Sequence, residues 1–440
     1  MNTNVPQLDD SRLKDALADV KARFQSANPF SFARWKKAKE VMPGGNTRSI
    51  LHYDPFPVMM QKGEGSSLTD MDGHHYLDFL GEYSAGLYGH SNSVIQDAIK
   101  EAVDGGTVLG APNRWEARLA ELICQRFPSI DQVRFTNSGT EANLMALGAA
   151  RAFTGREKIM VFDGSYHGGV LYFAHGGSPV NVPFEIVYGI FNDIQSTLDV
   201  IEASKNDLAA VIVEPMMGAG GCLLAEPDFL SALREATRAN EIVLIFDEVM
   251  TSRTSSGGLQ QHFGITPDMS TLGKYLGGGV SFGAFGGRLD IMELFDPALP
   301  KALPHAGTFN NNVMSMAAGC AGLGQVFTTE VADALYEKGE SFKTQLNTLI
   351  KNQNLSMQVT GVGSLLNIHM TGRPIRSPGD LDDIIPEKHT LIHLEMMLRG
   401  FMYAQRGYMA LSIPMTQENL DAFADTFEEV IDVHADLLQG

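Results

Sequence analysis

Residues 241–253 read EIVLIFDEVMTSR, and this stretch decides the class of fold. Five apolar residues lead directly to an acidic pair, Asp247 and Glu248. A short, uninterrupted apolar run favours a strand buried on both faces, as in a parallel sheet. Ligands of open parallel sheets bind at the carboxyl ends of the strands. We therefore expect a strand that presents Asp247 to a ligand, although this stretch alone leaves open that Asp247 caps a helix.

The neighbouring sequence repeats this pattern from about residue 90 to 320. Short β-rich runs alternate with helical stretches, which indicates βαβ units and a mainly parallel sheet. The other strand candidates are QVRFT (132–136), EKIMVF (157–162), LAAVIVEP (208–215) and SFGAFGG (281–287). Helical patterns of good quality cover residues 141–153 and 228–238. The expected fold class is α/β.

The two ends of the chain have a different organisation. A chain of 440 residues is too long for one simple core, so two unequal domains are expected. Helical patterns and short, alternating runs at both ends predict a smaller α+β domain built from them. The predicted helices are 1–27, 31–41, 329–349, 387–398 and 417–438, with short antiparallel strands between residues 56 and 80. The expected division is 1–80 (N-terminal part of the small domain), 81–325 (large domain) and 326–440 (C-terminal small domain).

Composition excludes several classes of partner. The formal charge of −19 and the pI near 5.0 oppose binding to nucleic acid or anionic lipid. No window approaches the roughly 20 apolar residues of a membrane span, and the opening residues lack a secretory pattern. Cys124, Cys222 and Cys320 are too widely spaced for a zinc site, so we expect reduced core thiols and no metal. The predicted location is the cytoplasm.

A phosphate site is indicated by FTNSGTEANLMALGAAR (135–151). A strand ending at Phe135 would run into a turn of small residues and a helix that starts near Gly139. Such a helix start offers unpaired N–H groups and the positive end of the helix dipole. Ser138, Gly139 and Thr140 are the expected phosphate donors. The alternative for this segment alone is that Asn137 or Ser138 only caps the helix.

Lys274 lies in TLGKYLGGG (271–279), among small and apolar residues. A lone lysine is usually a solvated surface charge, but a desolvated lysine has a lowered pKa and attacks aldehydes to form a Schiff base. Its freed amine is then the natural base for moving a proton between substrate and cofactor. Asp247 would hold the proton on a pyridine nitrogen, which makes the ring an electron sink.

FDGSYHGGV (162–170) adds an aromatic residue between glycines. Tyr166 could stack on one face of a pyridine ring, with Val249 closing the other face. For His167, a direct substrate contact and a hydrogen-bonded loop histidine remain equally open.

The motifs NSGTEAN, SYHGG, VIVEP, FDEVMT, TLGKYLGGG and HAGTFNNN occur in the order found in class III aminotransferases. The chain resembles this family of fold-type I pyridoxal-phosphate enzymes from about residue 35 to the C-terminal helix. The separation of 27 residues between Asp247 and Lys274 (274 − 247) also suits the family. PGGNTRS, DEVMTSR and GTFNNNVM make the chain most similar to the aromatic β-amino-acid (β-phenylalanine) aminotransferases.

This resemblance implies a homodimer in which Thr308 reaches the partner's cofactor phosphate, and it places Glu214 near the cofactor ring. It implies a ping-pong transfer from a β-amino acid to a keto acid such as 2-oxoglutarate or pyruvate. Arg48 and Arg406 match positions that hold substrate carboxylates, although either alone could be a surface ion pair. Many relatives carry Gln where this chain has Met250, so a polar contact near the ring hydroxyl is absent or replaced.

Two alternatives remain. Glutamate-1-semialdehyde aminomutase shares most of the motifs, but its pattern is closer to GTLSGNP than to the GTFNNN of this chain, and Arg406 also speaks against it. A cofactor-binding protein without catalysis is disfavoured by the presence of both Lys274 and Asp247.

Overall fold

The computed structural model describes residues 10–382 and 384–439. Its largest sheet has the strand order β4-β12-β11-β10-β7-β5-β6. The strands are β4 (Gln132–Thr136), β5 (Lys158–Phe162), β6 (Ile186–Gly189), β7 (Leu208–Val213), β10 (Val243–Asp247), β11 (Met269–Gly273) and β12 (Gly283–Gly287). β12 runs antiparallel to both neighbours, whereas the pairs from β11 to β6 are parallel. The predicted α/β fold with a mostly parallel sheet is confirmed.

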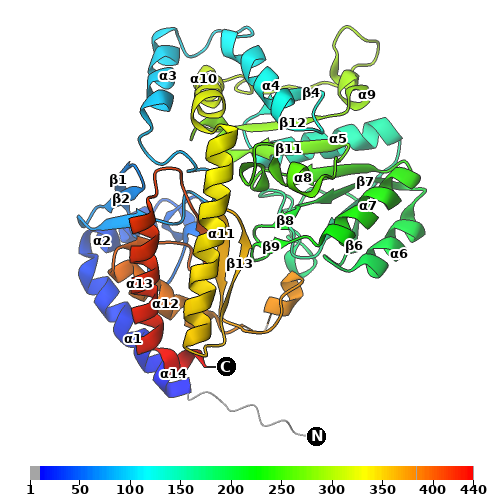
Figure 1. The fold of residues 1–440 in the computed structure, drawn as a ribbon. Helices are drawn as coiled ribbons and strands as arrows, with labels where there is room; N and C mark the ends of the chain where they lie inside the picture. Colours follow the sequence, from blue (N-terminus) through cyan, green and yellow to red (C-terminus); the bar gives the residue numbers. More distant parts are fainter. Residues whose placement is uncertain (1–9, 383, 440) are drawn as a thin grey trace, which may run out of the picture.

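Helices cover both faces of this sheet, and the strands are apolar for that reason (Figure 1). Val243 and Ile245 pack with α5 on one face, while Leu244 and Phe246 pack with α6 and α7 on the other. The helices are α5 (Gly139–Thr154), α6 (Ile194–Ser204) and α7 (Pro227–Ala239), and shorter helices α8 (Gly258–Phe263) and α9 (Leu289–Met292) follow. All five residues of β10 are therefore buried.

The parallel register brings chemical groups to one edge of the sheet. Val213 pairs with Phe246, so Glu214 and Asp247 follow at the same level on adjacent strands. Asp247 in turn pairs with Thr271, three residues before Lys274. The carboxyl ends of β7, β10 and β11 thus form one side of a shared site.

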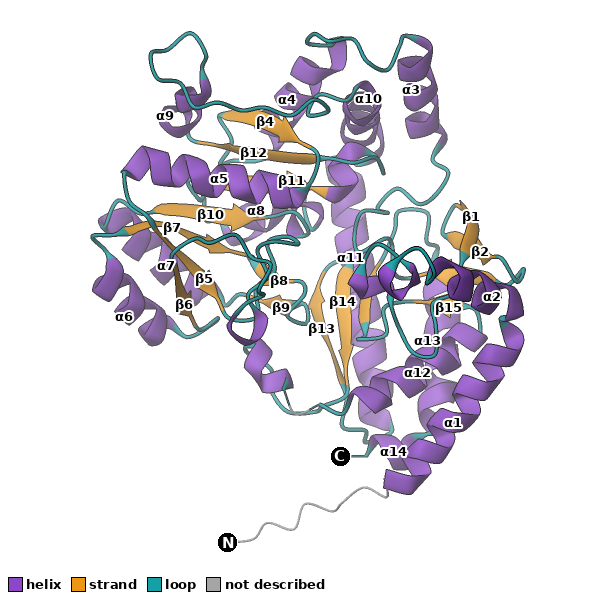
Figure 2. Ribbon diagram, turned by 180° about the vertical axis from the view of Figure 1, so that it is seen from behind, coloured by secondary structure: helices purple, strands orange, loops and turns teal. Residues whose placement is uncertain are grey.

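The two chain ends meet in a second region, below and beside α11 in Figures 1 and 2. β15 from the C-terminal part pairs with β3 from the N-terminal part, through Phe401 and Leu77. One sheet contains β1 (Met60–Glu64), β2 (Ser67–Asp70), β3 (His75–Asp78) and β15 (Phe401–Met402), and another contains β13 (Gln358–Val362), β14 (Leu365–His369) and β16 (Tyr408–Ala410). The domain boundaries at residues 80 and 325 stay a prediction.

The helices of this second region are α1 (Asp10–Ala27), α2 (Pro29–Ala38), α11 (Thr329–Asn352), α12 (Pro386–Leu398), α13 (Gln417–Val433) and α14 (Ala435–Leu438). The helices α3 (Ser93–Asp104), α4 (Arg114–Arg126) and α10 (Val313–Ala321) lie beyond the β4 side of the large sheet, and β8 (Met216–Met217) pairs with β9 (Leu223–Leu224). The helix predicted for residues 417–438 is interrupted, because His434 leaves the helical region at φ −107° and ψ 14°. For residues 1–9, the predicted first helix lies outside the described residues.

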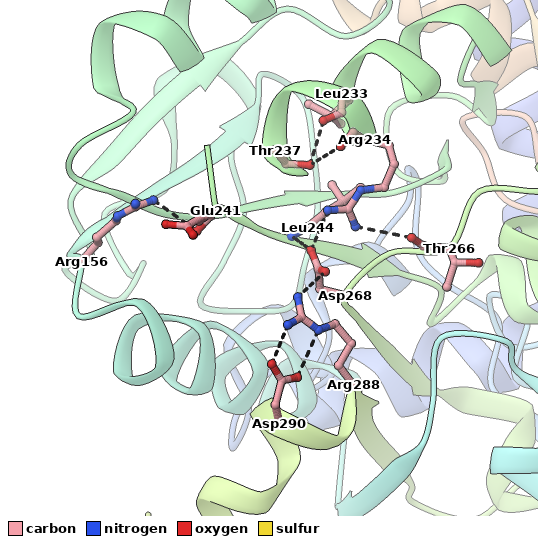
Figure 3. Close-up of polar contacts among 10 residues, drawn as sticks. All are labelled: Arg156, Leu233, Arg234, Thr237, Glu241, Leu244, Thr266, Asp268, Arg288 and Asp290. Carbon is pink, nitrogen blue, oxygen red and sulfur yellow. Dashed lines mark hydrogen bonds and ion pairs between the residues drawn. The ribbon is translucent and has the colours of Figure 1, made fainter. Parts of the chain in front are cut away.

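The end of the sheet opposite the site is held by a buried carboxylate (Figure 3). Asp268 accepts hydrogen bonds from Arg234 (2.9 Å), Arg288 (2.9 Å) and the main-chain N–H of Leu244 (2.8 Å). A cleft of about 1010 Å³ lies here. Its polar groups are largely paired with one another by these hydrogen bonds.

Within the described part of the chain, none of the helices has the length and hydropathy to cross a membrane.

Candidate active site

Asp247 ends β10 as a nearly fully buried carboxylate, only 5% exposed. Its Oδ2 accepts a hydrogen bond from the side-chain amide of Asn143 on α5 (2.8 Å) and lies 2.8 Å from Nδ1 of His167. Its Oδ1 accepts from the main-chain N–H of Val249 (3.0 Å). The network continues to Thr271, whose hydroxyl donates to Asn143 Oδ1 (2.6 Å). The carboxylate is therefore fixed in position from three sides.

For His167, the structure has one of the two arrangements left open by the sequence. Its side chain is completely buried and pairs with Asp247, and Asn143 donates to its main-chain carbonyl (2.8 Å). The ring has no exposed surface in this structure. The geometry is that of a loop histidine that holds Asp247. A direct substrate contact of His167 stays a prediction.

Lys274 follows β11 in a left-handed backbone conformation, with φ 55°. Its Nζ donates a hydrogen bond to the main-chain carbonyl of Tyr83 (2.8 Å). Burial lowers the pKa of Lys274 to about 8, although the carboxylates of Asp247 and Glu214 oppose this shift. Near neutral pH a useful fraction of this amine is uncharged and nucleophilic, as the sequence predicted for a desolvated lysine.

Glu214 lies beside Asp247 and is 5% exposed. Its two oxygens accept from the main-chain N–H groups of Tyr166 (2.9 Å) and Gly218 (3.0 Å). Burial raises the pKa of Glu214 to about 7, with the charge of Asp247 adding to the rise. The thioether of Met250 packs on Gly218, because a Cβ there would lie 2.2 Å from its sulfur. Met250 thus fills this side of the site without a hydrogen-bond donor.

Ser138, Gly139 and Thr140 form the start of α5 next to the same edge. Ser138 is the N-cap and accepts from the N–H of Glu141 (3.2 Å), so the capping interpretation holds. Capping and phosphate binding are compatible, since one side chain does not satisfy all the free N–H groups of the first turn. Thr140 lies against the loop of Tyr166, with its hydroxyl accepting from the N–H of Gly169 (3.2 Å).

Val249 and Tyr166 flank this turn from different elements. Val249 packs on Gly139 and Gly273, where added Cβ atoms would lie within 3.2 Å of it. Tyr166 is 45% exposed and packs edge-on against Tyr172, with 5.8 Å between the ring centres. A flat ligand between these two side chains, as the sequence predicts, stays a prediction.

Arg48 and Arg406 both approach the site through Tyr83. The guanidinium of Arg48 lies 5.5 Å from the Tyr83 ring and forms an ion pair with Glu82. Arg406 is exposed, and its NH1 donates to the carbonyl of Ala219 (3.2 Å). Burial raises the pKa values of Tyr83 and Tyr166, and the positive charges of both arginines oppose the two shifts. Arg406 and Tyr83 also line the same cavity, so both arginines lie near Tyr83.

Thr308 lies on an exposed loop beside the start of α5. Asn310 of this loop accepts a hydrogen bond from the side-chain amide of Asn137 (2.9 Å), next to Ser138. The loop is thus close to the phosphate turn of its own chain. The role of Thr308 across a subunit interface stays a prediction.

Sequence reasoning missed three contributors. Asn143 stood in the quoted NSGTEAN motif, but its contact with Asp247 depends on the position of α5. Tyr83 acts through its main-chain carbonyl, which carries no sequence signal, and Glu82 pairs with Arg48 across 34 positions.

These groups fit pyridoxal 5′-phosphate. A helix start suits its phosphate, a strand-end carboxylate held by hydrogen bonds suits its ring nitrogen, and an amine of lowered pKa suits its aldehyde. The fold and this set of groups define the class of protein, an α/β enzyme dependent on pyridoxal phosphate.

The chain belongs to the class III aminotransferases, because the model of that family matches residues 50–431. It is 50% identical to a β-phenylalanine transaminase of Variovorax paradoxus over 97% of this chain and 98% of the relative. The crystal structure of that enzyme matches with a TM-score of 0.96, covering 97% of this chain and 99% of that one. A glutamate-1-semialdehyde 2,1-aminomutase of Methanothermobacter thermautotrophicus is 35% identical over 90% of this chain and 97% of the relative. The protein is a pyridoxal-phosphate-dependent transaminase.

Proposed function

We propose that this enzyme transfers the amino group of an aromatic β-amino acid, similar to β-phenylalanine, to 2-oxoglutarate or pyruvate. The observation that carries the proposal is that Arg48 lies on the ring of Tyr83 and Arg406 lines a cavity with it, while the carbonyl of Tyr83 accepts from Lys274. Amino donor and keto acceptor both bear carboxylates and take turns at one site, so each needs a cation. A guanidinium binds a carboxylate with two parallel hydrogen bonds, which a lysine cannot do.

The two arginines differ in what holds them. Arg48 is neutralised by Glu82, whereas the side chain of Arg406 donates to the main-chain carbonyl of Ala219. Arg406 lies between β15 and β16, next to Gly407 at φ 95°. We assign one arginine to the β-amino acid and the other to the keto acid, with the Arg406 loop moving to admit the aromatic group.

Space for an aromatic group exists beside Arg406. A cavity of about 550 Å³ is lined by Arg406 and by largely apolar side chains, among them Ile50, Leu80, Tyr83 and Met402. A phenyl ring fits such a volume and surface. The β-phenylalanine transaminase from Variovorax paradoxus supports the same class of substrate at 50% identity.

The reaction divides its tasks among the residues of the site. Bound pyridoxal 5′-phosphate supplies an aldehyde for the amino group and a ring that takes up the electron pair left when a proton departs. Asp247 holds the ring nitrogen protonated, and Asn143 and His167 hold Asp247. When its amine is free, Lys274 carries the proton between the substrate carbon and the aldehyde carbon of the cofactor. Ser138, Gly139 and Thr140 bind the phosphate. Tyr166 and Val249 pack on the two faces of the ring, and Glu214 lies near it.

We also propose a homodimer in which Thr308 reaches the phosphate of the partner. Exposed apolar side chains surround its loop, with Phe309 57% and Val108 77% exposed. Asn311 links the two segments by donating to the carbonyl of Ala111 (3.3 Å). A second copy of the chain would cover this surface. The three free cysteines fit a reducing compartment, and we propose the cytoplasm.

The alternative function is that of a glutamate-1-semialdehyde 2,1-aminomutase, since a relative of that name is 35% identical to this chain. A non-catalytic role is disfavoured by the presence of both a lysine of lowered pKa, Lys274, and a fixed carboxylate, Asp247.

The test replaces Arg48 and Arg406 by Ala separately. Each variant should raise the KM for β-phenylalanine or for the keto acid by about tenfold to a hundredfold, the loss of a hydrogen bond between charged groups. The KM for 1-phenylethylamine, which has no carboxylate, is the control and should change little. Equal effects on the acid and the plain amine would contradict the carboxylate roles.

A further inference from the structure

Arg253 is an almost completely buried arginine, 1% exposed, that follows Asp247 by six residues. Its three nitrogens donate to neutral groups: Nε to the hydroxyl of Ser364 (3.1 Å), NH1 to the carbonyl of Ser84 (3.0 Å), and NH2 to the carbonyl of Leu411. Burying a charge without an opposite charge is costly. These contacts join the segment after β10 to three separate segments: the turn after β3 (Ser84), the connection between β13 and β14 (Ser364) and the residue after β16 (Leu411).

One of these segments is a left-handed turn. Gly81, Glu82, Tyr83 and Ser84 have φ angles of 52°, 46°, 53° and 77°. A residue other than glycine in this conformation costs roughly 1–2 kcal/mol, so three in succession need external support. Asp78 supports the start of the turn, since its Oδ1 accepts from the N–H groups of Leu80 and Gly81 (3.0 Å each). Arg253 supports its end through Ser84.

The carbonyls of the turn point to two cations in succession. The carbonyl of Tyr83 accepts from Lys274 Nζ (2.8 Å), and that of Ser84 accepts from Arg253 (3.0 Å). The Tyr83 ring is stacked on Tyr408 with 5.7 Å between centres and 11° between planes. The amine of Lys274 is therefore held by a strained turn, and Arg253 stabilises that turn by a hydrogen bond to Ser84.

We propose that Arg253 is a positioning residue for Lys274, which it serves by fixing the turn of residues 81–84 so that the Tyr83 carbonyl receives the amine. This rests on the proposed catalytic role of Lys274. Arg253 also acts through its charge, which adds to the effect of burial in lowering the pKa of Lys274. A loosened turn would let the amine leave the position from which it transfers protons.

The test compares the holoenzyme of wild type with Arg253→Met, Arg253→Lys and Arg156→Met. Arg156 is the matched control: it also donates to main-chain carbonyls, those of Leu208, Asn240 and Glu241, but at the opposite end of the sheet (Figure 3). Arg253→Met should lower kcat about tenfold to a hundredfold with KM within about threefold, since a 1 Å misplacement has effects of this size. Arg253→Lys should recover part of kcat, and Arg156→Met should keep kcat.

A second measurement reads the turn itself. Main-chain hydrogen exchange in the peptide covering residues 78–90 should be faster in Arg253→Met than in wild type, and unchanged in Arg156→Met. If Arg253→Met does not fold, Ser364→Ala, which removes only the acceptor of Nε, should show both effects more weakly. Normal kcat in a variant with faster exchange would overturn the proposal, as would lowered kcat with unchanged exchange.

Lys274→Ala separates this proposal from the proposed function. Retained turnover in that variant would remove the catalytic role of Lys274. An inactive Lys274→Ala together with a normal Arg253→Met would remove only the positioning role of Arg253.

Discussion

Nδ1 of His167 and Oδ2 of Asp247 lie 2.8 Å apart, with the histidine side chain fully buried. The contact holds one oxygen of the carboxylate, and Asn143 adds a second hydrogen bond to the same oxygen. Because this pair is buried away from water, the Asp247 carboxylate keeps one orientation, and a hydrogen bond that it accepts there is strong. We infer that the carboxylate accepts such a hydrogen bond from the protonated ring nitrogen of the cofactor.

Asp247→Asn should bind the cofactor but lose several orders of magnitude in the rate of amino transfer, because a neutral amide does not keep the ring nitrogen protonated. Stopped-flow absorbance of the half-reaction with β-phenylalanine measures this. The matched control is Glu248→Gln, since Glu248 is the next buried carboxylate but accepts from Leu259 and Gln260 on α8. That variant should lose stability rather than rate per folded enzyme. Near-normal rates in Asp247→Asn would place the ring-binding acid elsewhere.

The rate at which the cofactor-free chain captures pyridoxal 5′-phosphate should rise with pH and level off above about 8, following the pKa of Lys274. Only the uncharged amine attacks the aldehyde, and an ordinary lysine would keep gaining reactivity to about 10.4. Asp247→Asn should move the midpoint to lower pH, because the charge of Asp247 raises this pKa. A midpoint near 10 in wild type would show that Lys274 is solvated.

Glu82→Gln should lower the KM for β-amino acids about two- to fivefold, since a substrate carboxylate no longer displaces Glu82 from Arg48. The effect is small because both side chains of the pair are more than 40% exposed. Steady-state kinetics with β-phenylalanine, compared with 1-phenylethylamine, measure it. An equal change for both donors would mean that Glu82 acts on the site in another way than through Arg48.

Thr308→Ala should weaken cofactor retention by about 1.5–3 kcal/mol, the usual value of a hydrogen bond to a charged group. Equilibrium binding of the cofactor measures this, and sedimentation gives the oligomeric state. Thr266→Ala, an exposed threonine at the opposite end of the sheet, is the control. A monomeric and fully active wild-type protein would contradict the cross-subunit role.

The parts of the fold that follow from local pattern were predictable. The apolar run of β10 has both faces covered, and the small residues around Lys274 fit a desolvated amine. The direction of β12 was not predictable, because its five residues GAFGG carry no pattern that separates parallel from antiparallel pairing. The break at His434 likewise lacks a proline or glycine to mark it.

The site shows the same limit. Asp247 and Lys274 stand in motifs with their own local chemistry, whereas the turn of residues 81–84 places Glu, Tyr and Ser in a conformation that their side chains disfavour. Tertiary contacts from Arg253 and Asp78 decide that conformation. The burial of His167 and its pairing with Asp247 depend in the same way on segments 80 residues apart.

Amino transfer from β-phenylalanine to 2-oxoglutarate tests the central claim most directly. Purified enzyme with pyridoxal 5′-phosphate should form one glutamate for each β-phenylalanine consumed, Lys274→Ala should form none above background, and glutamate-1-semialdehyde should not be isomerised. Isomerisation of glutamate-1-semialdehyde to 5-aminolevulinate by the wild type, without amino transfer from β-phenylalanine, would contradict the account.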